Sequence, residues 1–66
     1  MSNYRVCIIK MNSDAVTNYI KFDNKEDAEH YAKNESSADY KHIYEVQKNN
    51  EGDFVRIKSY LNGKEE

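Results

Sequence analysis

Apolar and polar positions alternate most clearly between Tyr40 and Leu61, where two strand-like runs flank Asn50-Glu51-Gly52-Asp53. Directly opposed residues of antiparallel strands share one face of a sheet, so the length of the turn decides which side chains meet. An odd-length turn would set Ile57 against Glu45, whereas an even-length turn that pairs Asn49 with Phe54 separates an apolar face from a mixed one. The pairs that we then expect are Val46 with Ile57, Tyr44 with Ser59, Glu45 with Lys58, and Ile43 with Tyr60.

The N-terminal part of the chain predicts a second hairpin. Tyr4 to Met11 (YRVCIIKM) is apolar on both alternating sets of positions, which is typical of a strand inside a sheet. Asn12-Ser13-Asp14 is a polar turn, and Val16 to Phe22 follows as the next strand. A three-residue turn aligns Tyr4, Val6 and Ile8 with Phe22, Ile20 and Asn18, and leaves Cys7, Ile9 and Met11 on the second face with Tyr19.

A single helix is predicted from about residue 24 to residue 35. Asp23 and Asn24 are both good N-caps, and Asp23 has capping-box spacing to Glu26. The alanines at 28 and 32, with Tyr31, form a narrow apolar stripe at helical spacing. Small side chains on this stripe favour close packing of the helix against a sheet.

The order of elements indicates an α+β fold of the ββαββ type. Because the helix reverses the chain, the third strand can pair antiparallel with the first, which gives a four-stranded antiparallel sheet in the order 2-1-3-4 with the helix on one face. We expect residues 1–61 to form this single domain and residues 62–66 to be a disordered tail. The predicted core consists of Tyr4, Val6, Ile8, Val16, Ile20, Phe22, Ala28, Tyr31, Ala32, Tyr44, Val46, Val55, Ile57 and Leu61.

Composition adds bounds to this picture. Apolar residues make up 38% of the 66 residues and charged residues 33%, so a monomer would have a thin core and burial against a partner is favoured. The net charge of −2 argues against a protein whose whole surface binds nucleic acid. The single Cys7 and the lack of a signal-peptide or membrane-length apolar run favour a cytoplasmic protein with no membrane association. Richness in Asn, Lys and Tyr is typical of AT-rich genomes, including many phages.

One short helix covers only one face of the sheet, so the other face is the predicted interaction surface. Arg5, Cys7, Ile9 and Met11 are expected there from the first strand, and Lys41, Ile43, Glu45 and Gln47 from the third. Aromatic residues and arginine most often anchor protein interfaces. The partner-binding residues that we select on this face are Tyr19, Lys21, Ile43, Phe54, Arg56, Lys58 and Tyr60.

Three functions compete for this face. It can be buried in a homodimer, sheet against sheet, or it can dock on a larger macromolecule. It can also bind RNA or single-stranded DNA, but the central strand would offer Cys7 and Ile9 where RNA-binding sheets carry aromatic residues. We therefore favour a non-catalytic protein-interaction module, specifically a small phage- or plasmid-encoded inhibitor of a host enzyme or defence complex. The acidic helix residues Glu26, Asp27 and Glu29 are a second candidate surface, although a solvated helix face explains them as well.

The sequence gives no support for catalysis, a cofactor or a metal site. Cys7 on an apolar central strand fits an inert structural thiol better than a nucleophile. Glu26 and His30 are four residues apart on the helix and so share one face of it, but two ligands are too few for a stable metal site. His30 is expected to face solvent and His42 to lie at the sheet edge near Leu61. The only glycines are Gly52 and Gly63, so no phosphate-binding loop is present.

Overall fold

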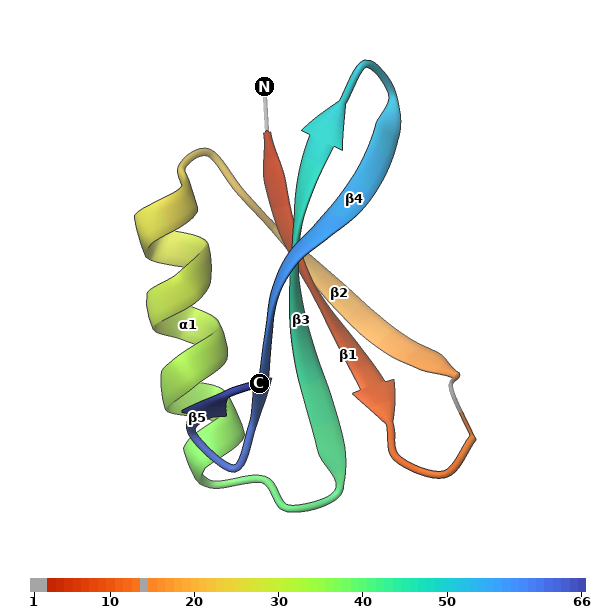
Figure 1. Cartoon of the computed structure of the whole chain (residues 1–66), viewed down its shortest axis with the longest axis vertical. Helices are drawn as coiled ribbons and strands as arrows, with labels where there is room; N and C mark the ends of the chain where they lie inside the picture. The colour runs from red at the N-terminus through yellow and green to blue at the C-terminus, as the bar shows by residue number, and fades with distance from the viewer. Residues whose placement is uncertain (1–2, 14) are drawn as a thin grey trace.

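The computed structural model describes residues 3–13 and 15–66 and shows one helix packed on one face of a twisted antiparallel sheet (Figure 1). The strands are β1 (Tyr4–Lys10), β2 (Val16–Phe22), β3 (His42–Asn50), β4 (Asp53–Leu61) and β5 (Lys64–Glu65), and the helix is α1 (Lys25–Ser37). The sheet order is β2-β1-β3-β4-β5. The predicted α+β class is confirmed, but the sheet has five strands instead of four.

The fifth strand comes from residues that we expected to be disordered. Asn62 and Gly63 both have positive φ (57° and 80°), which is the geometry of a two-residue type I′ hairpin turn. This turn brings Lys64 opposite Leu61, and the Gly63 N–H donates to the buried Ser36 hydroxyl at 3.1 Å. Because the turn contacts the end of α1, the last residues are held against the domain.

The helix begins and ends close to the predicted residues. Asn24 is the N-cap, and its side-chain oxygen accepts from the Asp27 N–H at 2.9 Å. Ala28 and Ala32 are fully buried, and so is Ser36 one turn later, so the small residues let α1 approach the sheet closely. The helix runs two residues beyond the predicted end because this third small residue continues the buried stripe.

The register of the N-terminal hairpin is as predicted in the part that is away from the turn. Tyr4, Val6 and Ile8 lie opposite Phe22, Ile20 and Asn18. The register then shifts at Thr17, so that Val16 lies opposite Ile9. Val16 was predicted to be in the core, but this bulge turns it to the other face, where it is 57% exposed.

A second bulge changes the C-terminal hairpin. The turn is of even length, and Asn49 lies opposite Phe54 as predicted. Ile57 then has no partner, so Lys58 lies opposite Val46 and Tyr60 opposite Tyr44. The predicted pairs beyond this point are wrong, because one extra residue on one strand moves every following side chain to the opposite face.

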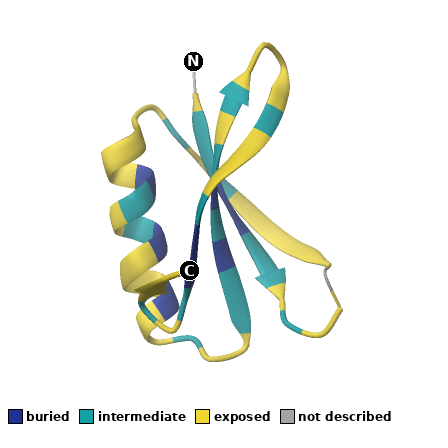
Figure 2. Ribbon diagram, in the orientation of Figure 1, coloured by how far each residue is buried: buried dark blue, intermediate teal, exposed yellow. Residues whose placement is uncertain are grey.

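The core is consequently smaller than predicted and centred differently (Figure 2). Its buried residues are Val6, Ala28, Ala32, Tyr44, Val46 and Tyr60, with Tyr4, Ile8, Phe22 and Tyr31 packed around them. Ile57 (38% exposed) and Val55 (48% exposed) are not in the core. Ile57 is the bulged residue, and Val55 belongs to the hairpin tip, which extends beyond the N-terminal start of α1 (Figure 1).

Candidate functional site: the open face of the sheet

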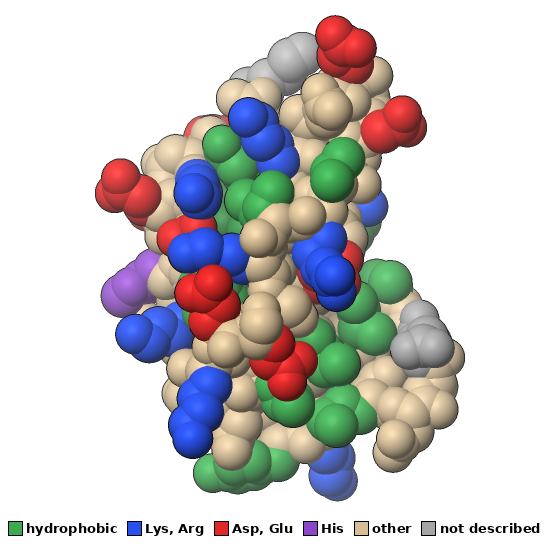
Figure 3. Space-filling model, viewed as in Figure 1, with side chains coloured by type: hydrophobic (Ala, Val, Ile, Leu, Met, Phe, Trp, Pro, Cys, Tyr) green, Lys and Arg blue, Asp and Glu red, His purple; other side chains and the backbone are tan. Residues whose placement is uncertain are grey.

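The face of the sheet opposite α1, here called the open face, carries two rows of side chains with contrasting character. Ile9 lies between Val16 on β2 and Ile43 on β3. Leu61 shares this face because it is two residues beyond Ser59, which lies opposite Glu45. These four residues, Val16, Ile9, Ile43 and Leu61, form the apolar row. In Figure 3 apolar side chains gather over the lower ends of β1 and β3, the end at which this row lies.

The second row lies four residues earlier in β1, at Arg5, and is basic. Arg5 lies opposite Lys21 on β2 and opposite Gln47 on β3, and Gln47 lies opposite Arg56 on β4. We call Lys21, Arg5, Gln47 and Arg56 the basic row. It contains both arginines of the chain. At about 3.3 Å per residue, roughly 13 Å separate the apolar row from the basic row.

Arg5 is held in place by contacts from three strands. Its guanidinium carbon lies 3.9 Å from the centroid of the Phe54 ring and 5.5 Å from that of Tyr19, and both are cation–π distances. The Arg5 Nε–H also donates to the Gln47 side-chain oxygen at 2.7 Å. The aromatic residues of the open face therefore position an arginine, and each turns one ring face toward it.

The charge of the open face is predominantly positive. Its acidic residue is Glu45, and this carboxylate already accepts from the Gln47 amide at 2.6 Å. Among the residues described, neither arginine nor Lys21 forms an ion pair. The basic row is thus available to an anionic group from outside the molecule.

The predicted partner-binding residues are divided between two faces. Tyr19, Lys21, Ile43, Phe54 and Arg56 share the open face, as the strand registers show. The placement of Lys58 and Tyr60 there was wrong, because the Ile57 bulge turns both toward α1.

On the α1 side of the sheet, Lys58 and Tyr60 have structural roles. Tyr60 is 5% exposed in the core, and the Lys58 ammonium lies 3.4 Å from Glu29 on α1 and 3.7 Å from Glu65 on β5. The Glu29 side chain raises the pKa of Lys58 through hydrogen bonding and charge. Arg5 and Gln47 were expected on the open face but were not selected, and their importance follows from contacts between strands that sequence spacing does not show.

The acidic surface of α1 is partly occupied within the molecule. Asp27 accepts from the Asn24 amide at 3.1 Å at the start of the helix, and Glu29 lies between Lys25 and Lys58. Glu26 is exposed in the first turn, where the helix dipole favours its charge. Local structure therefore accounts for much of this surface.

The residues considered for chemistry are separated. Cys7 is 2% exposed on the open face, and burial raises the pKa of its thiol, which donates weakly to Gln47. His30 pairs with Asn34 on the exposed side of α1. Within residues 3–13 and 15–66, no group of three or more His, Cys, Asp or Glu side chains could hold a metal ion.

His42 belongs to a small polar network at the start of β3, opposite Lys10, where the sequence had suggested a sheet edge. The Asp39 carboxylate accepts from the Lys41 N–H at 2.9 Å, from the Tyr44 hydroxyl at 2.9 Å, and bonds to the His42 ring at 2.9 Å. These hydrogen bonds, led by that of the Lys41 backbone, lower the pKa of Asp39. Burial, followed by the hydrogen bond to Asp39, raises the pKa of Tyr44 to about 12.

We expect Tyr44 to couple folding to alkaline pH. Its pKa is higher in the folded chain than in the unfolded one, so its contribution to stability is complete below pH 10 and is lost as the pH rises toward 12. An absorbance titration of tyrosinate should show a late phase, to which Tyr31 and Tyr60 also contribute because burial raises the pKa of each, and the Tyr44→Phe variant should lose part of its amplitude. A late phase of unchanged amplitude in Tyr44→Phe would contradict the assignment.

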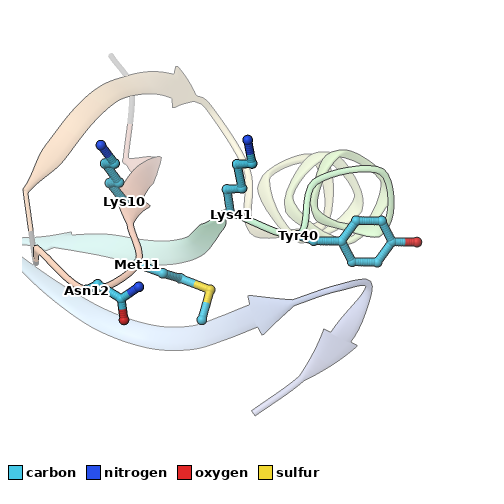
Figure 4. A pocket seen from close by; sticks show the side chains of 5 residues that line it. All are labelled: Lys10, Met11, Asn12, Tyr40 and Lys41. Atoms are coloured by element: carbon cyan, nitrogen blue, oxygen red, sulfur yellow. The ribbon is translucent and has the colours of Figure 1, made fainter.

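A shallow hollow of about 280 Å³ lies at the end of β1, where the Met11 N–H donates to the Lys41 carbonyl at 3.0 Å (Figure 4). It is lined by Lys10, Met11, Asn12, Tyr40 and Lys41. The two lysine side chains extend to one side of the ribbon, Met11 and Asn12 to the other, and Tyr40 away from both. Because these side chains do not converge, the hollow lacks the arrangement of a ligand site.

Comparisons of the chain with protein-family models, with curated proteins and with solved structures give no significant match. In the described part of the chain, no helix has the length and apolar character that crossing a bilayer requires.

Proposed function

We propose that this chain is a non-catalytic protein-interaction module that binds a partner protein through the open face. The observation that supports this most directly is the pairing of an apolar row with a basic row on the face that α1 leaves uncovered. Apolar contact provides affinity, while positive charge selects the partner and speeds association. The ordered Arg5, held by two aromatic rings, reduces the entropy lost on binding.

A different protein fits this face better than a second copy. In a homodimer packed sheet against sheet, the arginines would either oppose each other or lie outside the contact, because Glu45 is already paired with Gln47. An acidic and partly apolar partner uses both rows. A homodimer through the apolar row is the second candidate, since Val16, at the end of that row, is 57% exposed.

For the biological role, we propose that binding blocks the partner, and that the protein is a phage- or plasmid-encoded inhibitor of a host enzyme or defence complex that acts in the host cytoplasm. A composition rich in Asn, Lys and Tyr supports this role. A small domain that only covers a surface needs no catalytic group of its own.

The test is affinity capture from a host lysate with charge-reversed variants. The Lys21→Glu/Arg56→Glu variant should retain the specific partner at least about tenfold less well than the wild type, because it reverses two charges of the basic row. The matched control is Lys33→Glu/Lys48→Glu, which makes the same change at exposed residues away from the open face. Equal loss in both variants would show that only net charge matters and would contradict the proposal.

Light scattering distinguishes the homodimer, the second candidate, from binding of a different protein. A homodimer through the apolar row should show a mass that rises with concentration in the wild type and stays at the monomer value in Val16→Asp. A monomeric wild type at high concentration excludes this dimer.

A further inference from the structure

We infer that Arg5 is the anchor of the open face and that it receives a side-chain carboxylate from an acidic, amphipathic segment of the partner. This inference rests on the proposed function and specifies the partner's chemistry. Arg5 uses its Nε–H for Gln47, and its remaining N–H groups form no ion pair among the residues described. A guanidinium held by contacts with two rings can therefore offer a planar set of donors with little further ordering.

The basic row has a spacing that suits a row of carboxylates. Adjacent strands lie about 4.8 Å apart, so Lys21 and Arg5 are neighbours while Arg56 is roughly 10 Å from Arg5, across Gln47. Acidic side chains one and two turns apart on a helix, at about 5.4 Å per turn, match these steps. Both arginines can then be engaged by one segment.

The apolar row favours a peptide over a nucleic acid. A nucleic acid would need exposed ring faces for its bases, yet Tyr19 and Phe54 each turn one face to Arg5. Ile9, Ile43 and Leu61 offer apolar contact roughly 13 Å from the basic row, which phosphates cannot use. A helical partner segment, about 10–12 Å wide, that crosses the strands between the two rows, with carboxylates along one side and large apolar side chains along the other, matches both rows.

The experiment uses the full chain and synthetic helical peptides. One peptide carries glutamates one and two turns apart along one side of the helix and leucines along the other side, and its control has glutamine in place of each glutamate. The chain has only two arginines, so its two Nε–H signals in ¹⁵N NMR report directly on the site, and the Arg56→Lys variant assigns them. Oligo(dT) serves as the nucleic-acid probe.

We expect the glutamate peptide to shift the Arg5 and Arg56 signals saturably and to bind at least about tenfold more tightly than the glutamine peptide. Tyr19→Ala should weaken this binding several-fold while thermal melting shows that the variant is folded, because Tyr19 is 46% exposed. Lys33→Glu should bind as the wild type does.

Three results would overturn the inference: no shift with the glutamate peptide, equal binding of the glutamate and glutamine peptides, or tighter binding of oligo(dT). The proposed function would survive the first two if Lys21→Glu/Arg56→Glu still loses its captured partner in the lysate experiment. If that variant keeps its partner while the peptide shifts both arginines, the site binds carboxylates but the proposed function is wrong.

Discussion

Replacement of Tyr60 by alanine should destabilise the domain by about 3 kcal/mol, the lower end of the cost of truncating a buried aromatic residue. Tyr60 is 5% exposed and packs in the cluster that joins α1 to β1 and β3. A domain of 66 residues has a total stability of roughly 3–10 kcal/mol, so the variant will be close to unfolding. Urea denaturation followed by circular dichroism measures the loss.

The matched control is Tyr40→Ala, which makes the same chemical change at a side chain that is 70% exposed. It should alter the stability by less than about 0.5 kcal/mol. Tyr60→Phe keeps the ring in the core and should fold, which gives a measurable variant if Tyr60→Ala does not. Equal stabilities for the Tyr60→Ala and Tyr40→Ala variants would place Tyr60 on the surface and contradict the bulged register.

The bulged register that the Tyr60 variants test is a part of the fold that the sequence does not predict. Alternation and turn length predict one end of each hairpin correctly, as Val6 opposite Ile20 and Asn49 opposite Phe54 show. The bulges at Thr17 and Ile57 are not predictable from alternation, because neither carries a glycine or another local signal. Each inserts one residue, which is enough to reverse the direction of every side chain that follows.

The consequences of the second bulge extend to the candidate site. It removes Lys58 and Tyr60 from the open face and turns Lys58 toward Glu29, a partner that strand pairing cannot indicate. It brings Leu61 to the open face in their place, which completes the apolar row. Arg56 precedes the bulge on β4 and Arg5 lies on β1, so the placement of both arginines on the open face follows from the sequence.

The C-terminal strand was missed for a different reason. Asn62-Gly63 is the dipeptide most typical of a two-residue hairpin turn, but so few residues follow it that a strand was not expected. The contact of Gly63 with the end of α1 gives this short strand its support.

Gly63→Ala should therefore cost roughly 2–3 kcal/mol, and Gly52→Ala about 1 kcal/mol. Both glycines have positive φ (80° and 95°), a conformation that costs an alanine energy at either turn. They differ in the space around them: a Cβ at Gly63 would lie 3.0 Å from the Ser37 Cβ and 3.2 Å from its Cα, whereas Gly52 has nothing within 4 Å. The backbone of α1 cannot move away as a flexible side chain could, so the turn must shift.

The comparison of these two variants by urea denaturation isolates the packing of the β4–β5 hairpin on the helix. A shift of the turn would also disturb the Gly63 hydrogen bond to Ser36 and the approach of Glu65 to Lys58. Amide hydrogen exchange at Gly63 and Glu66 should accelerate in Gly63→Ala but not in Gly52→Ala, since the Glu66 N–H donates to the Ser59 carbonyl at 2.8 Å. If the two variants agree within about 0.5 kcal/mol, the last five residues do not pack on α1 and the sheet ends at β4.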